Sequence, residues 1–191
     1  MTLAGKRLFI ATKLSRDFLN ELTNAVKYLK KELDCEVNWV KPENCHITYA
    51  FLGDVLPDKG KVIIEKIKAV KVNKFSISAG NLNSFPLKGS PGIIWLGINR
   101  GADNIQEIAE NLRADALSEG FAFKDKFYSH ITLGRVRREK MCGKSFKNVF
   151  AQATKLIDRS LSFDVVNIEL FESILNAQGS VYRSLYKREL I

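Results

Sequence analysis

The chain contains only two histidines, and each is followed two positions later by threonine, in His46-Ile47-Thr48 and His130-Ile131-Thr132. In a β-strand, residues i and i+2 point to the same face, so each motif would present an imidazole beside a hydroxyl. The motifs lie 84 residues apart in a chain of 191. This spacing predicts a duplicated unit of about half the chain, folded into two pseudo-symmetric lobes that meet across a central cleft.

Short apolar segments alternate with amphipathic segments along the whole chain, which predicts an α+β fold. No linker is long or polar enough to separate independent domains, so we expect one domain over residues 1–191, with antiparallel sheet in each lobe and helices outside. We expect strands over residues 7–12, 37–40, 46–52, 75–79, 93–98, 130–136, 161–175 and 181–190. We expect helices from an N-cap at Ser15 to Leu33 and over residues 62–70, 105–117 and 149–157, and a loop over residues 83–92.

Composition excludes several classes of protein. A hydrophobic content of 46% excludes a disordered chain. No apolar stretch approaches the roughly 20 residues that span a bilayer, so we expect a cytoplasmic protein without a membrane partner. Three widely spaced cysteines without a CxxC pattern argue against a disulfide scaffold and a cysteine-based zinc site, and we expect free thiols. Two histidines are too few for most histidine-rich metal sites and no GxxxxGK[ST] loop is present, so we expect no metal and no cofactor.

Two imidazoles facing each other across a cleft have a definite chemical use. The unperturbed pKa of histidine lies near neutrality, so one ring can be neutral while the other is protonated. Such a pair supplies a general base and a general acid on opposite sides of a reacting group. The two threonine hydroxyls can donate hydrogen bonds to anionic oxygens. These are the requirements for in-line displacement at a phosphodiester without a metal.

A single His-x-Thr motif on a strand is most often an ordinary half-buried pair. Here the two motifs contain every histidine of the chain, and this coincidence favours the catalytic interpretation. From the residues alone, the assignment of acid and base stays open.

At these residues the sequence resembles the 2H phosphoesterase superfamily, which is named for two His-x-Thr/Ser motifs. The match is best to its RNA 2',3'-cyclic phosphodiesterase group, historically called 2'-5' RNA ligase, and it covers nearly the whole chain. It rests on Arg7–Ala11, Trp39–Thr48 with Phe51–Gly53, Phe85–Pro86, Ile94–Gly97, Tyr128–Arg135, Glu172–Ser173, Gly179 and Tyr182. The chain departs from the family at Ser129, where proline is common, and at Tyr49, where an aliphatic residue is usual.

The resemblance implies a bilobal fold and metal-independent hydrolysis of RNA 2',3'-cyclic phosphates to 2'-phosphomonoesters. By this analogy His46 is the proton donor and His130 the proton acceptor. Thr48 and Thr132 would hold the nonbridging oxygens of the phosphate. Two further residues would bind substrate: Arg135, which would help to bind the phosphate, and Phe51, which would stack on the base.

Each of those two further residues has an alternative interpretation. Arg135 can be an ordinary exposed arginine at the end of a strand. Simple alternation puts Phe51 on the face opposite His46 and Thr48, which favours core packing, and a stacking role then requires a bend in the strand.

A formal charge of +9 suits RNA, since phosphate contacts supply most sequence-independent affinity. We expect a monomer acting on RNA with 2',3'-cyclic phosphate ends, with tRNA fragments among the candidates. A basic cluster follows the second motif, formed by Arg135, Arg137, Arg138 and Lys140. Two other functions stay open: 2'-5' RNA ligation or cleavage of another small cyclic nucleotide on the same fold, and a non-catalytic RNA-binding module. The binding module is disfavoured, because it does not require histidine at either motif and both histidines of the chain lie there.

Overall fold

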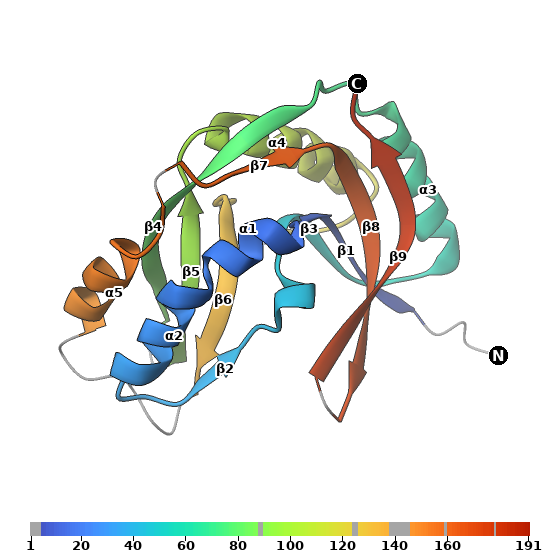
Figure 1. The fold of residues 1–191 in the computed structure, drawn as a ribbon. Helices are drawn as coiled ribbons and strands as arrows, with labels where there is room; N and C mark the ends of the chain where they lie inside the picture. Colours follow the sequence, from blue (N-terminus) through green and yellow to red (C-terminus); the bar gives the residue numbers. More distant parts are fainter. Residues whose placement is uncertain (1–4, 88–89, 124–125, 138–145, 159, 178) are drawn as a thin grey trace.

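We describe the fold from a computed structural model of the chain, in residues 5–87, 90–123, 126–137, 146–158, 160–177 and 179–191 (Figure 1). Within these residues nine strands form one curled antiparallel sheet in the order β7-β4-β5-β6-β3-β1-β8-β9, with β2 pairing to β6. The strands are β1 Lys6–Lys13, β2 Val37–Trp39, β3 His46–Val55, β4 Phe75–Leu87, β5 Ser90–Ile98, β6 His130–Val136, β7 Ser162–Val165, β8 Asn167–Asn176 and β9 Gly179–Glu189. The helices are α1 Arg16–Glu21, α2 Thr23–Glu32, α3 Pro57–Ala69, α4 Ala102–Ser118 and α5 Phe146–Thr154, and η1 Pro42–Asn44 is one 3-10 turn.

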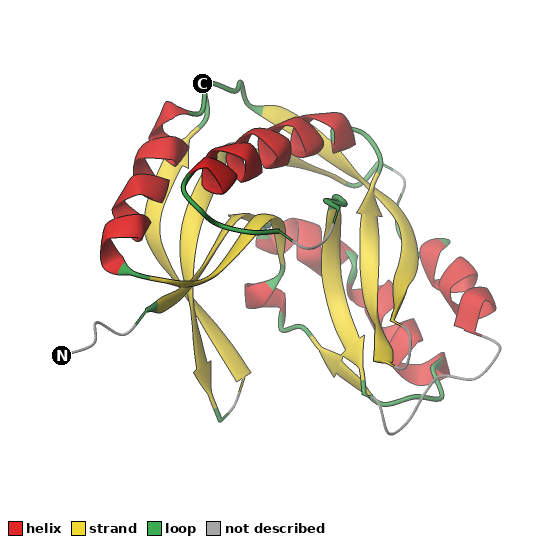
Figure 2. Cartoon of the chain, turned by 180° about the vertical axis from the view of Figure 1, so that it is seen from behind, coloured by secondary structure: helices red, strands yellow, loops and turns green. Residues whose placement is uncertain are grey.

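The sheet has two halves that join between β3 and β6. One half contains β1, β3, β8 and β9, and helices α3 and α4 pack against it. The other contains β2, β4, β5, β6 and β7, and α1, α2 and α5 cover one of its faces, whereas Figure 2 shows β4, β5 and β6 from their uncovered side. Both halves combine strands from distant parts of the sequence, so they are not the N- and C-terminal halves of the chain.

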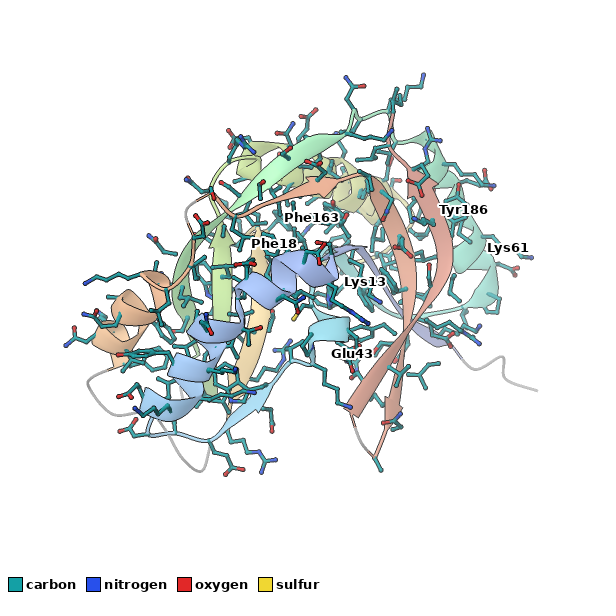
Figure 3. All side chains as sticks on the ribbon, viewed as in Figure 1. Lys13, Phe18, Glu43, Lys61, Phe163 and Tyr186 are labelled. Carbon is teal, nitrogen blue, oxygen red and sulfur yellow. The ribbon has the colours of Figure 1, made fainter. Side chains whose placement is uncertain are left out.

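The predicted α+β class and antiparallel pairing are confirmed. The cap at Ser15 is confirmed as well, since its hydroxyl accepts the backbone N–H of Phe18 at 3.2 Å. Phe18 then packs edge-on against Phe163 of β7, which brings α1 against the sheet (Figure 3). The expected single helix after Ser15 is interrupted at Leu22, which ends α1 and precedes α2.

Two expected boundaries are wrong. The segment 83–92 is not the expected loop, because β4 continues to Leu87 and β5 begins at Ser90. Beyond Ser78, β4 pairs only with β5 among the described strands, so its other edge can accept a proline that lacks an N–H. The expected strand 161–175 is two strands, because β7 pairs with β4 whereas β8 pairs with β1 and β9.

Most buried apolar residues form one continuous core between the sheet and its helices. A second, smaller cluster contains Phe9, Ala11 and Phe171, with Tyr182 packed against it. The expectation of free thiols holds for buried Cys45 and is wrong for Cys35, which is disulfide-bonded. No helix among the described residues is long and apolar enough to cross a membrane.

Candidate active site

The two His-x-Thr motifs begin the two strands that join the halves of the sheet. Ile47 of β3 pairs with Ile131 of β6 in antiparallel register, and both isoleucines are fully buried in the core. Continued by one residue to each side, this register sets His46 across from Thr132 and His130 across from Thr48. All four of these side chains are partly exposed, on the face opposite the isoleucines. The structure therefore brings the two motifs together around one pseudo-two-fold point.

A β-bulge in each strand changes which later residues share this face. The pairing of β3 with β1 shifts by one residue at Tyr49, and the pairing of β6 with β5 shifts by one residue at Leu133. After each bulge the alternation is reversed, so both strands begin with the same order of buried and exposed positions. The fifth residue after each histidine is then exposed on the site face: Phe51 in β3 and Arg135 in β6.

Phe51 thus does not pack in the core, contrary to the interpretation that simple alternation favoured. Its side chain is 62% exposed, and its ring centroid lies 6.0 Å from that of Phe9. The bend that a stacking role required is present as the bulge at Tyr49. Tyr49 itself is fully buried, and its hydroxyl is 2.7 Å from Thr12 Oγ1, which donates in turn to the carbonyl of Asn167 at 2.7 Å.

Both imidazoles are held in the same way. His46 Nδ1 lies 2.6 Å from the carbonyl oxygen of Asn44, and His130 Nδ1 lies 2.7 Å from that of Tyr128. A carbonyl oxygen only accepts hydrogen bonds, so each Nδ1 carries a proton and donates it. In the neutral ring the lone pair is then on Nε2. The carbonyl two residues before each histidine therefore selects the nitrogen that is available for proton transfer.

Aromatic side chains enclose both histidines. The ring of His46 lies 4.9 Å from Phe9 and 5.3 Å from Tyr182, measured between centroids. His130 lies 5.0 Å from Phe85 and 6.1 Å from Trp95, and both of these rings also contact Tyr128. These apolar surroundings remove water from the rings.

The same surroundings oppose protonation of the histidines. The pKa of His46 is lowered to about 4, mainly by burial and also by the nearby His130 and Arg135, while the hydrogen bond to Asn44 acts in the opposite direction. Burial and the charge of Arg135 also lower the pKa of His130. Both imidazoles are therefore neutral at pH 7 in the free protein, and the positive charge of Arg135 acts on both of them.

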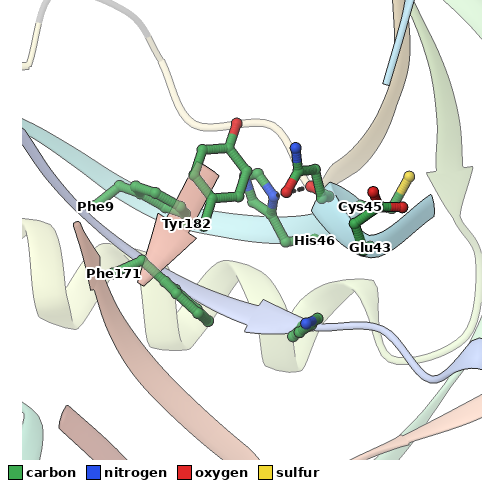
Figure 4. A pocket seen from close by; sticks show the side chains of 8 residues that line it. Phe9, Glu43, Cys45, His46, Phe171 and Tyr182 are labelled. Carbon is green, nitrogen blue, oxygen red and sulfur yellow. Dashed lines mark hydrogen bonds between the residues drawn. The ribbon is translucent and has the colours of Figure 1, made fainter. Parts of the chain in front are cut away.

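A small pocket that is open to solvent lies beside His46. Its lining includes the rings of Phe9, Phe171 and Tyr182, and Figure 4 shows Glu43 and Cys45 on the other side of the imidazole from these rings. Asn44 also lines the pocket. Lys13, which pairs with His46 in the β1–β3 register, completes the lining. Burial and the charge of Glu43 raise the pKa of the Cys45 thiol to about 11, so this cysteine is protonated at neutral pH.

Two residues of the basic cluster predicted after the second motif are described, Arg135 and Arg137, and both are exposed. Arg135 faces the site, whereas Arg137 forms an ion pair with Glu36 at 2.7 Å and donates to Asn38 at 3.1 Å. Arg138 and Lys140 lie outside the described residues. Among the described residues, no group of three or more His, Cys, Asp and Glu side chains is placed to hold a metal ion.

The sequence did not indicate several residues of this site. Asn44 and Tyr128 act on the histidines through backbone carbonyls, which any residue type provides. Phe9, Phe85 and Trp95 belong to strands whose apolar pattern predicts burial but not contact with an imidazole.

Comparison with known proteins gives consistent matches over most of the chain. A family model described as LigT-like phosphoesterase matches residues 13–95 and 96–182, and each segment contains one His-x-Thr motif. The RNA 2',3'-cyclic phosphodiesterase of Archaeoglobus fulgidus is 31% identical over 182 residues, which cover 94% of this chain and 97% of that protein.

Two solved structures share the fold. TT0787 of Thermus thermophilus matches with a TM-score of 0.74 at 22% identity, over 96% of this chain and 97% of that one. Escherichia coli LigT complexed with 3'-AMP matches with a TM-score of 0.70 at 21% identity, over 98% of each chain.

Proposed function

Because the chain belongs to the LigT-like phosphoesterase family, we propose that it hydrolyses RNA 2',3'-cyclic phosphodiester ends to 2'-phosphomonoesters without a metal. Curated relatives with the name RNA 2',3'-cyclic phosphodiesterase support the substrate. The observation that carries the proposal is the matched pair of imidazoles, each with Nδ1 bonded to a carbonyl and with Nε2 available for proton transfer. The chain acts as one catalytic domain, and each lobe contributes one His-x-Thr motif.

In the proposed reaction, His130 is the base and His46 is the acid. His130 Nε2 takes a proton from water as the water oxygen attacks phosphorus. The bond from phosphorus to the 3'-oxygen breaks, and His46 Nε2 gives its proton to that oxygen. One P–O bond forms as another breaks, and the product carries a 2'-phosphate and a 3'-hydroxyl.

The remaining polar groups stabilise negative charge on the phosphate. The hydroxyls of Thr48 and Thr132 donate to the nonbridging oxygens. Arg135 offers a fixed positive charge at the same face, which attracts the anionic substrate and compensates charge in the transition state. The exposed ring of Phe51 provides a surface on which a nucleobase stacks.

The negative charge of the substrate favours protonation of His46. In the free protein the pKa of His46 is about 4, so the acid form is rare at pH 7. A bound phosphodiester carries a negative charge beside both rings and raises their pKa values. Binding of the phosphate therefore favours the protonated imidazole that the acid requires.

The experiment uses an oligonucleotide that ends in a 2',3'-cyclic phosphate, incubated with the protein in excess EDTA. We expect conversion to the 2'-phosphate, and we expect His46→Ala and His130→Ala each to lower kcat by about 10²–10⁴-fold. Absence of conversion by the wild type contradicts the hydrolase, and loss of activity in EDTA contradicts the metal-free route. Ligation would appear only when an RNA with a 5'-hydroxyl is added.

A second substrate tests which histidine is the acid. Sulfur in place of the leaving 3'-oxygen gives a thiolate that departs without a proton, because its conjugate acid is far stronger than an alcohol. The His46→Ala variant should then recover most of its lost rate, while His130→Ala should not. Recovery by His130→Ala instead would reverse the assignment.

A further inference from the structure

Asn44 connects the imidazole of His46 to a distant part of the chain. It is the last residue of η1, separated from β3 by Cys45, and its carbonyl oxygen is 2.6 Å from His46 Nδ1. Its side-chain Nδ2 donates to the carbonyl of Ser180 in β9 at 2.8 Å. The residue that selects the reactive nitrogen of His46 is thus itself attached to the β8–β9 hairpin.

The hairpin also contacts His46 directly. Tyr182 lies two residues after Ser180 on β9, and its ring meets the imidazole at 87° with 5.3 Å between centroids (Figure 4). The contacts form a closed loop, from His46 to Asn44, to Ser180, along β9 to Tyr182 and back to His46. A displacement of the hairpin therefore moves both the ring that covers the imidazole and the carbonyl that holds its Nδ1.

The other histidine is held without such a connection through an amide. At the equivalent position, two residues before His130, stands Tyr128, whose side chain is 55% exposed and contacts the rings of Phe85 and Trp95. The backbone carbonyl has the same role at both histidines, but among the described residues only the Asn44 side chain adds a hydrogen bond to a separate strand. This difference makes the role of the Asn44 amide testable within one protein.

We propose that Asn44 is a positioning residue, whose amide fixes the β8–β9 hairpin to the carbonyl that holds His46 Nδ1–H. The catalytic consequence rests on the function proposed above. Loss of the amide leaves the Asn44 carbonyl present but frees it to move, so that the proton of the neutral His46 ring distributes between Nδ1 and Nε2. Both tautomers give the same imidazolium on protonation, but a ring without the bond at Nδ1 is not held with Nε2 toward the substrate.

The first test does not depend on activity. With only two histidines, the imidazole ¹⁵N signals are assigned from His46→Ala alone, and they report the tautomer of each ring. In wild type, both rings should carry their proton on Nδ1. In Asn44→Ala, the His46 signals should show a mixture of tautomers while those of His130 stay unchanged. An unchanged His46 tautomer, or an equal change at His130, overturns the proposal even if the protein has no cyclic phosphodiesterase activity.

The second test is a double-mutant cycle on turnover. We expect Asn44→Ala to lower kcat by about tenfold with KM within about twofold, because misplaced catalytic groups slow chemistry more than binding. In the His46→Ala background, the same substitution should change the residual rate by less than about twofold. An equal loss in both backgrounds, or a loss matched by the fraction unfolded, would show a general structural role. Asn20→Ala, an exposed amide on α1, is the matched control and should behave like wild type.

Discussion

The depressed pKa of His46 predicts a pH-dependent loss of stability that can be assigned to one residue. The pKa is about 4 in the folded protein and about 6.5 in the unfolded chain. Between these values the unfolded state binds more protons, so stability falls as pH falls through this window. The full difference of about 2.5 pH units corresponds to about 3 kcal/mol, and about 2 kcal/mol of it is lost between pH 7.5 and pH 5.

The assay is urea unfolding followed by fluorescence of the two tryptophans, at pH 7.5, 6.5, 5.5 and 5. The carboxylates titrate similarly in wild type and in His46→Asn, so the difference between the two proteins isolates the histidine. We expect the free energy of unfolding of wild type to fall by about 2 kcal/mol more than that of His46→Asn. His130→Asn is a comparison variant. Its free energy of unfolding should also depend less on pH than that of wild type, since the pKa of His130 is lowered too. Equal pH slopes for wild type and His46→Asn would refute the reasoning.

Three further tests, the first with a control substitution, address separate parts of the structure. Gly134→Ala would place its Cβ 2.6 Å from Val37 Cγ1, so the free energy of unfolding should fall by about 1–3 kcal/mol in the same urea titration. The control is Gly60→Ala on α3, whose Cβ meets nothing closer than 3.7 Å and which should leave stability unchanged or raise it. Tyr49→Phe removes a buried hydroxyl bonded to Thr12 and should cost about 0.5–1.5 kcal/mol of stability with kcat unchanged, and a fall in kcat would place this hydroxyl in the catalytic machinery. Phe51→Ala should raise KM for the cyclic phosphate RNA about tenfold without loss of stability, and an unchanged KM would exclude base stacking on this ring.

The sequence was sufficient for the class of fold and for the family. Alternation of apolar and polar residues located the central strands, because every second residue of a half-buried strand faces the core and is apolar. It failed within residues 83–92, where prolines and glycines are typical of a loop, because Pro86 lies in β4 and Pro91 and Gly92 lie in β5. Long-range pairing decides such segments, and local composition carries no information about it.

The site shows the same division. The i+2 threonines placed an imidazole and a hydroxyl on one face correctly, since that inference needs only the strand period. The strand period could not predict on which face of the sheet Phe51 lies, because the bulge at Tyr49 depends on the register with β1. The ion pair of Arg137 with Glu36 could not be predicted for a similar reason, since it depends on the pairing of β2 with β6.

The two motifs share one backbone plan and differ in the side chains attached to it. Each strand places a histidine, a threonine, a bulge and an exposed residue in the same order, and each histidine is held by the carbonyl two positions before it. Acid and base roles require asymmetry, and the shared plan provides none. The fifth position after the histidine provides it, with Phe51 on one strand and Arg135 on the other. Under the proposed function, Phe51 would offer a surface for a base and Arg135 a charge for a phosphate, which would favour one orientation of the substrate on this symmetric frame.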